Sequence, residues 1–565
     1  MDMIVREDRT MKIYPAVRKK PQFIVWSAFL LGLLMLLALL AVNPVYYRDS
    51  THYLAQTTAF RLGLWDRAFP NWLPQLTCGL GGLLTYLGLA PQRALVLSSG
   101  LMMAATVFPV YGFCRFFMAR SCAAGCAWLA ILIPHLIRYG MAPLTDSARW
   151  LFLMLSLYLI FEWTARPRGW KILLLGASYG ALALSRTEGV VFVAMLCAVH
   201  WFYGAWKQGG KAVNFVKILP SVLLPLPVML AMVFPRLLQM HRLSGYWVLD
   251  SRQLNAVASV VNMLSGDGQG VEVMSGGAVL SAARFSDPAL IVRMTNNFFD
   301  GFFPLYGVFA LIGIYVILAG KRWRAEHTVI LLLPSGNLLL HIAMQSAAGR
   351  YFLINALFWL PFTMEGLRAV YGQLVRRFPV RGGRAVAGAA IMVGVILVWQ
   401  GLDNLRPPRR LKELRAAGML WRASFRENRT PAILFLGRDE RGLGCCLNAN
   451  SLFYAEPKQC GEEALEKLLR FGTAPENIHH WQEDLSGSGL VRPDAVILQR
   501  RFSEDFESLA ARLGEMPGWR PFDLPAELAK DVRIFVPREK RNDIPVRQDA
   551  ANFPPPGMKQ QNQTR

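Results

Sequence analysis

Eleven long apolar runs constrain the fold of this chain more than any other feature. A helix that crosses a bilayer needs about 20 predominantly apolar residues, and the runs are close to that length, although the one at 171–185 is short. Apolar residues make up 53% of the chain and charged residues only 18%. The sequence therefore predicts a polytopic α-helical membrane protein. The predicted spans are 22–42, 92–117, 121–139, 147–164, 171–185, 189–205, 215–235, 298–320, 328–346, 350–367 and 385–402.

The basic residues, which give the chain a formal net charge of +23, gather in short clusters between these runs. Every second turn is basic and poor in acids, which is the pattern of cytoplasmic loops in a multi-pass plasma or inner membrane protein. We therefore expect residues 1–21 to be cytoplasmic and the C-terminal region to be extracytoplasmic. No helix-turn-helix, zinc-finger or aromatic-basic signature is present, so nucleic acid is not an expected partner. The eight cysteines form no CxxC pair, so no structural zinc motif is indicated.

The membrane region extends over 22–402 and contains two longer loops that we expect on the outer side, at 44–91 and 236–297. Residues 50–64 of the first loop have helical apolar spacing with polar positions between. This spacing predicts an amphipathic helix that lies in the membrane interface.

The composition becomes soluble after the last run, and residues 403–540 are expected to form an extracytoplasmic domain. Strand-like and helix-like segments alternate there, which predicts a small α/β domain. The expected strands are 432–437, 494–498 and 532–536, and the expected helices are 462–471 and 504–513. Residues 541–565 are polar and contain three successive prolines, which is typical of a disordered tail.

Asp49 follows the first run directly, within the sequence Tyr-Tyr-Arg-Asp-Ser-Thr-His-Tyr at 46–53. Charges at a membrane boundary tend to mark ion, substrate or catalytic sites. We interpret Asp49 as a general base that takes a proton from an acceptor hydroxyl. The alternative is an interfacial ion pair between Arg48 and Asp49 that only ends the helix. We favour catalysis because other polar motifs are expected on the same side of the membrane.

A second acidic motif, Ala-Pro-Leu-Thr-Asp at 142–146, precedes the fourth predicted span. Either Thr145 or Asp146 would cap that helix well, and capping alone would explain the motif. The functional alternative is that Asp146 holds the acceptor or a divalent metal.

Arg186 and Glu188 form a polar elbow between the fifth and sixth spans, in Ser-Arg-Thr-Glu-Gly at 185–189. They either form a local ion pair in a tight turn or line a cavity. Arg350 lies in Gly-Arg-Tyr at 349–351, at the outer end of the tenth span. It either extends towards lipid headgroups without a specific role or clamps a lipid-linked phosphate with its planar fork. His341, like the other span histidines, is expected to be a satisfied polar residue and not a metal ligand.

In this order and spacing, the motifs around Asp49, Asp146, Glu188 and Arg350 resemble those of the GT-C glycosyltransferases. This superfamily includes the protein O-mannosyltransferases and the bacterial enzymes that add aminoarabinose to lipid A. The similarity covers about 22–370. Many members have a second acid beside the first aspartate, whereas this chain has Ser50, a difference that bears on metal binding more than on base catalysis.

The resemblance implies an inverting glycosyltransferase that moves a sugar from a polyprenyl-phosphate donor to a glycan, lipid or protein acceptor on the outer face of the membrane. It implies that Asp49 is the base and that Arg350 and Arg186 bind the donor phosphate. It gives Asp146 and Glu188 a supporting role towards the acceptor or a metal. A transporter or flippase of lipid-linked sugars is the alternative, and it would need charges near mid-span and inverted repeats. A membrane anchor whose outer domain binds a polymer is the third possibility.

Overall fold

The structure is a computed structural model of the 565-residue chain. It describes residues 21–42, 48–61, 63, 75–186, 188–209, 212–250, 288–343, 349–377, 388, 392–400, 432–436, 451–455, 479–480, 495–500, 506–516, 518–530 and 532–538. The chain divides into two compact units, which are described separately. The helical unit comprises Met1–Val45 and Tyr53–Arg406, and the sheet unit comprises Tyr46–His52 and Pro407–Arg565.

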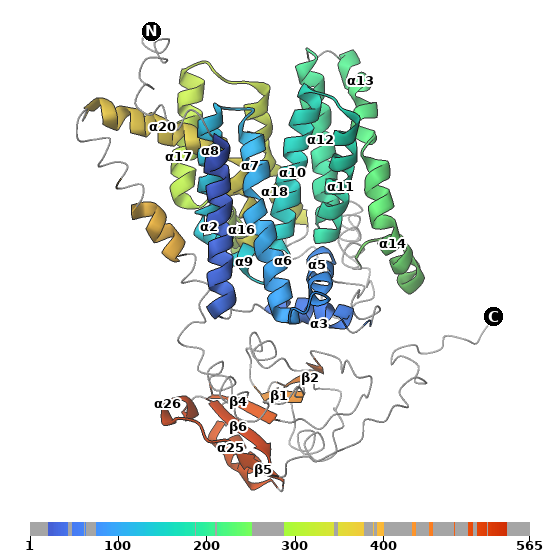
Figure 1. The fold of residues 1–565 in the computed structure, drawn as a ribbon, viewed down its shortest axis with the longest axis vertical. Helices are drawn as coiled ribbons and strands as arrows, with labels where there is room; N and C mark the ends of the chain where they lie inside the picture. Colours follow the sequence, from blue (N-terminus) through green and yellow to red (C-terminus); the bar gives the residue numbers. More distant parts are fainter. Residues whose placement is uncertain are drawn as a thin grey trace, which may run out of the picture. The chain divides into compact units, whose positions relative to one another are not determined.

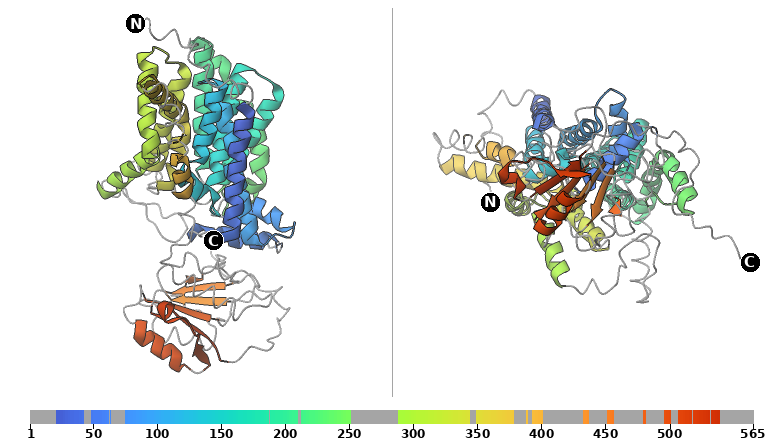
Figure 2. Two further views of the ribbon diagram at one scale, coloured as in Figure 1. Left: turned by 60° about the vertical axis from the view of Figure 1, so that its left-hand side comes forward. Right: turned by 90° about the horizontal axis from the view of Figure 1, so that it is seen from below.

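The helical unit is a bundle whose long helices run beside one another in both orientations shown (Figures 1 and 2). Its first helix, α2 (Pro21–Val42), has leucines on all sides, and Leu30, Leu34 and Leu37 are exposed. A helix that is apolar all round and still exposes leucines is suited to a lipid environment. After the first loop, the bundle continues with α6 (Pro91–Ala105), α7 (Val107–Cys114), α8 (Arg120–Ile131) and α9 (Pro134–Met141).

The middle of the helical unit contains α10 (Asp146–Ala165), α11 (Gly169–Ser185) and α12 (Gly189–Lys207), which are joined by short turns as antiparallel neighbours. They are followed by α13 (Ala212–Leu223) and α14 (Leu226–Ser244), which together contain one candidate span, Asn214–Arg242. The α11–α12 turn is tight: a Cβ atom on Gly189 would overlap the carbonyl oxygen of Leu182. Glycine is therefore needed at this elbow.

The last part of the helical unit packs α17 closely against α20. Its elements are α16 (Pro288–Asp300), α17 (Pro304–Ala319), α18 (Ala325–Ala343), the 3₁₀ turn η3 (Gly349–Tyr351), α19 (Ile354–Phe358) and α20 (Leu360–Arg377). Gly313 of α17 faces Gly366 of α20, and the backbones approach closely there. Small residues at such crossings are characteristic of membrane helix packing.

Within the described residues, five helices are long and apolar enough to cross a membrane, and seven spans result if each bent pair of helices counts as one. The predicted spans 121–139 and 298–320 are the two that bend, by 62° and 75°. In both, the second helix begins at a proline, Pro134 or Pro304. Proline lacks the N–H that would continue the preceding helix. Residues 392–400 of the predicted span 385–402 are helical, and most of the rest lies outside the described residues.

The first predicted outer loop contains two packed helices, α3 (Arg48–Arg61) and α5 (Leu76–Thr85). The helix predicted within residues 50–64 is therefore present. Its polar residues Gln56 and Thr57 are as buried as Tyr53 and Phe60, so at these positions the expected contrast between a polar and an apolar face is absent. Phe60 packs against α5, where a Cβ on Gly82 would collide with its ring.

The sheet unit contains a six-stranded sheet with the strand order β3-β2-β1-β4-β6-β5. Strands β1, β2 and β4 are parallel neighbours, whereas β3, β5 and β6 pair antiparallel. The bounds are β1 (Ala432–Leu436), β2 (Ser451–Ala455), β3 (His479–His480), β4 (Ala495–Gln499), β5 (Trp519–Pro521) and β6 (Val532–Pro537). The strands predicted at 432–437, 494–498 and 532–536 are therefore present, as is the helix predicted at 504–513, observed as α25 (Phe506–Glu515). The helix predicted at 462–471 lies outside the described residues.

Candidate functional site

Helix α10, on which the site is built, begins at a buried acid. Asp146 is the first residue of α10 and is 1% exposed. The segment before it is held by Ser99, whose Oγ donates to the Leu144 carbonyl at 2.8 Å. Thr145 occupies the N-cap position, but its side chain makes no capping hydrogen bond. Capping by Thr145 therefore does not explain the motif, and the Asp146 carboxylate faces guanidinium groups instead.

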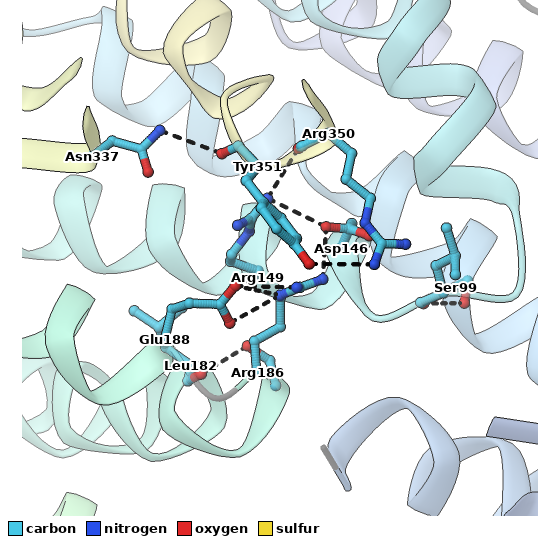
Figure 3. A network of polar contacts seen from close by, with 11 residues as sticks. Ser99, Asp146, Arg149, Leu182, Arg186, Glu188, Asn337, Arg350 and Tyr351 are labelled. Carbon is cyan, nitrogen blue, oxygen red and sulfur yellow. Dashed lines mark hydrogen bonds and ion pairs between the residues drawn. The ribbon is translucent and has the colours of Figure 1, made fainter. Parts of the chain in front are cut away.

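The α11–α12 elbow supplies the first of these groups. Arg186 donates from Nη1 to Asp146 Oδ1 at 3.0 Å, and from Nη2 to Glu188 Oε1 at 3.1 Å. Its Nε lies 3.3 and 3.2 Å from the two oxygens of Glu188. One guanidinium thus bridges two carboxylates that come from different helices, and all three side chains are buried (Figure 3). The local ion pair expected at the elbow is present, and it also reaches Asp146.

Arg149 joins this pair of acids to the η3 turn. It lies one turn into α10, is fully buried, and donates from Nη2 to Asp146 Oδ1 and to the Arg350 carbonyl oxygen, both at 3.3 Å. The Arg350 side chain extends from the same turn, and its Nη2 lies 3.5 Å from the Tyr351 hydroxyl. The network therefore contains Asp146, Arg186, Glu188 and Arg350, four of the five site residues that the sequence predicts (Figure 3).

The ring of Tyr351 lies at the centre of the cluster. Three guanidinium carbons lie near it, those of Arg186 at 4.7 Å, Arg350 at 5.3 Å and Arg149 at 5.9 Å from the ring centroid. His341 of α18 stacks on the ring with centroids 5.0 Å apart and an interplanar angle of 5°. Arginine groups over an aromatic face are attracted by its negative quadrupole. Tyr351 thus holds three like charges close together.

The charges fix the ionisation of Glu188 at the elbow. Burial alone would raise the pKa of the Glu188 carboxyl, but Arg186 and Arg149 hold that pKa well below its ordinary value of 4.5. The cause of the shift is the pair of guanidinium groups near the carboxylate in a site removed from water.

Three guanidinium groups and two carboxylates meet among the described residues of the cluster. Arg149 and Arg186 pair with Asp146, and Arg186 also pairs with Glu188. Arg350 is less buried than these residues and lies beside Tyr351. The arrangement therefore gathers guanidinium groups, which are suited to binding phosphate, around one aromatic ring.

Comparisons with known proteins address the fold. No protein-family model and no curated protein sequence matches the chain. Among solved structures, it is similar to ArnT from Cupriavidus metallidurans bound to undecaprenyl phosphate, with a TM-score of 0.54, 12% identity, and coverage of 90% of this chain and 97% of that one. It is also similar to the Archaeoglobus fulgidus oligosaccharyltransferase in complex with zinc and sulfate, with a TM-score of 0.52, 13% identity, and coverage of 86% and 69%. The same oligosaccharyltransferase tethered to an acceptor peptide gives a TM-score of 0.50 at 14% identity, with coverage of 85% and 69%.

This chain has the GT-C fold. The ordered motifs of the sequence predicted that fold, and the prediction is confirmed. The similarity to ArnT extends over 90% of this chain.

A divalent metal does not fit the described acids of the cluster. Such ions prefer carboxylate and carbonyl oxygens. Both oxygens of Glu188 and Oδ1 of Asp146 are already bound by guanidinium groups, which leaves Oδ2 of Asp146 without a described partner. In the described part of the chain, no group of three or more His, Cys, Asp and Glu residues is placed to hold a metal ion. We therefore assign no step to a metal at Asp146 and Glu188.

The fifth predicted site residue, Asp49, lies in α3, and the position of its side chain is outside what the structure describes. Tyr53, which follows four residues later in the same helix, interacts electrostatically with Arg186. Sequence reasoning missed Arg149 and the central place of Tyr351. The signal for Arg149 was present, since an arginine inside a predicted span is by default a candidate functional residue.

Proposed function

We propose that this protein is an inverting glycosyltransferase that moves a sugar from a polyprenyl-phosphate donor to an acceptor on the outer face of the membrane. The observation that carries the proposal is the group of three arginines around Tyr351 in a GT-C fold, of which Arg350 is the least buried. A polyprenyl tail can stay in the bilayer while its phosphate reaches the outer ends of the helices. ArnT, which has a similar fold, was solved with undecaprenyl phosphate bound.

The proposed chemistry needs one cationic clamp and one base. A phosphate is a good leaving group once its charge is held, so no separate general acid is required. Arg350, assisted by Arg186, stabilises the charge that develops as the bond from the anomeric carbon to the phosphate breaks. Asp49 takes the proton of the attacking acceptor hydroxyl, and in-line attack inverts the anomeric configuration.

In this proposal, Asp146 and Glu188 do not contact the acceptor. Both are buried and bound to arginines. They hold the Arg186 guanidinium in one orientation and compensate the cost of burying its charge. They therefore support the donor site through the arginines.

The experiment is complementation of a deletion strain, with mass spectrometry of the cell-envelope glycans as the readout. This design does not require the sugar to be known in advance. The wild-type gene should restore a sugar addition that the deletion loses. Asp49→Asn should not restore it, because loss of a general base costs about 10²–10⁴-fold in rate. Arg350→Ala should also fail, since the phosphate charge is then not held.

Asp523→Asn is the matched control, because it makes the same chemical change at an exposed aspartate of the sheet unit. It should complement fully. Full complementation by Asp49→Asn would remove the base assignment. Glycans that are unchanged in the deletion strain would contradict the proposed function. Movement of a lipid-linked sugar between leaflets by the purified protein, without formation of a glycosidic bond, would favour the flippase instead.

A further inference from the structure

The η3 turn that carries Arg350 is held by side chains of other helices. Arg149 Nη2 donates to the Arg350 carbonyl at 3.3 Å, across 201 residues of sequence. Asn337 of α18 donates from Nδ2 to the next carbonyl, that of Tyr351, also at 3.3 Å. Two successive carbonyls of the turn are thus fixed by a buried arginine and a buried asparagine. The backbone from which the Arg350 side chain extends is therefore placed by groups outside the turn.

Arg149 is poorly explained as a stabilising residue. It is fully buried, yet its Nε and Nη1 have no hydrogen-bond partner among the described residues. A buried cation whose donors are only partly satisfied costs more in desolvation than its contacts return. The contacts that it does make, to Asp146 and to the Arg350 carbonyl, link the two halves of the site. These contacts indicate that Arg149 positions the η3 turn relative to the start of α10.

We propose that Arg149 is the positioning residue for Arg350. Its Nη2 donates to both the Asp146 carboxylate and the Arg350 carbonyl and so fixes the turn against the start of α10. The Arg350 guanidinium is then held at the place where the donor phosphate binds. Arg149 itself is too deeply buried to meet the donor. This inference rests on the proposed function, since it assumes that Arg350 binds a lipid phosphate.

The test is a double-mutant cycle on the binding of undecaprenyl phosphate to the full chain purified in detergent. Arg350→Ala should weaken binding by about 10-fold or more, because charge-assisted hydrogen bonds are lost. Arg149→Lys should weaken it by about 10-fold, since the lysine side chain is one atom shorter and its ammonium does not reach the position of Nη2. The double variant should bind within about 2-fold of Arg350→Ala, because Arg149 acts through Arg350.

Arg324→Lys is the matched control. Arg324 also donates to backbone carbonyls across the bundle, those of Phe116 and Phe117, but it precedes α18 and lies at the opposite end of that helix from His341. It should bind undecaprenyl phosphate within about 2-fold of wild type. Arg149→Gln provides a second, uncharged variant in case a buried lysine disturbs folding, and it should show the same lack of additivity with Arg350→Ala.

The possible outcomes separate the two proposals. If Arg350→Ala leaves the affinity unchanged, the phosphate clamp of the proposed function fails, and the inference fails with it. If Arg350→Ala weakens binding and both Arg149 variants bind like wild type, the inference alone is overturned. It is also overturned if the double variant loses the product of the two single effects, which would show that Arg149 acts on the donor directly or through general packing.

Discussion

At the scale of single residues, the ion pair between Glu188 and Arg186 makes stability depend on pH. The pKa of Glu188 is lower in the folded chain than its ordinary value of 4.5. Its contribution to stability is therefore fully present above about pH 4.5 and is lost as the pH falls towards the folded pKa. Glu188→Gln should destabilise the protein by about 3–5 kcal/mol at pH 7, because it removes one of the two carboxylates that balance the buried Arg186 and its neighbour Arg149. Thermal unfolding in detergent from pH 7 to pH 3 should show the difference from wild type shrinking below about pH 4.5.

Glu162→Gln is the control for this prediction. Glu162 pairs with the buried Lys171 at 3.0 Å at the other end of α10, and the Glu162 side chain is partly exposed. Lys171 also donates to the carbonyl oxygens of Glu162 and Arg166, so it keeps partners in the variant, and the expected loss is about 1 kcal/mol or less. A loss at pH 7 as small for Glu188→Gln as for Glu162→Gln would show that the elbow pair is not structurally important.

Some residues of the site could be predicted from the sequence, whereas their contacts could not. Asp146, Arg186, Glu188 and Arg350 were predicted because polar residues at the outer ends of apolar runs are costly and therefore conspicuous. The contact of Arg149 with the Arg350 carbonyl could not be predicted, because it joins residues 201 apart through a backbone atom. The position of Tyr351 between His341 and three arginines likewise depends on tertiary packing.

At the scale of elements, the crossing of α17 and α20 depends on two glycines. A Cβ on Gly366 would overlap the Phe309 carbonyl oxygen, and one on Gly313 would overlap that of Phe362. Gly366→Ala should therefore separate the helices and destabilise the protein by about 1–3 kcal/mol, as overpacking usually does. Thermal unfolding of the purified protein measures the change.

Gly372→Ala in the same helix is the matched control, because a Cβ there meets nothing within 4 Å. It should be neutral or stabilise the protein by up to about 1 kcal/mol, since alanine favours helix more than glycine does. If Gly366→Ala behaves like Gly372→Ala, the close approach of the two helices is wrong.

Element boundaries were more accessible from the sequence than element shapes. The long apolar runs place α2 and α10 within one residue at each end, because the length needed to cross a bilayer is fixed. Hydropathy alone does not show the bends at Pro134 and Pro304, where one run becomes two helices. It also does not show that α3 is covered by α5, because burial of the polar Gln56 and Thr57 requires a partner helix.

At the scale of the whole molecule, the basic turns predict the sidedness of the chain. The turn between α10 and α11 exposes Arg166 and Arg168, and such clusters stay on the cytoplasmic side of a membrane. We therefore expect a cytoplasmic N-terminus and an extracytoplasmic sheet unit. Single cysteines, Arg168→Cys in that turn and Asp523→Cys in the sheet unit, should separate the two sides. A membrane-impermeant thiol reagent added to sealed right-side-out vesicles should label Asp523→Cys at once and Arg168→Cys only after permeabilisation.

The background of this experiment needs care because the chain has eight cysteines. Of those described, four are buried and Cys197 is partly exposed. Serine should therefore replace every cysteine that is not described as buried. These are Cys197, Cys445, Cys446 and Cys460, of which the last three lie outside the described residues. Labelling of both sites in sealed vesicles, or of Arg168→Cys alone, would contradict the predicted sidedness. The second result would also place the sheet unit away from the outer face, where lipid-linked donors are proposed to react.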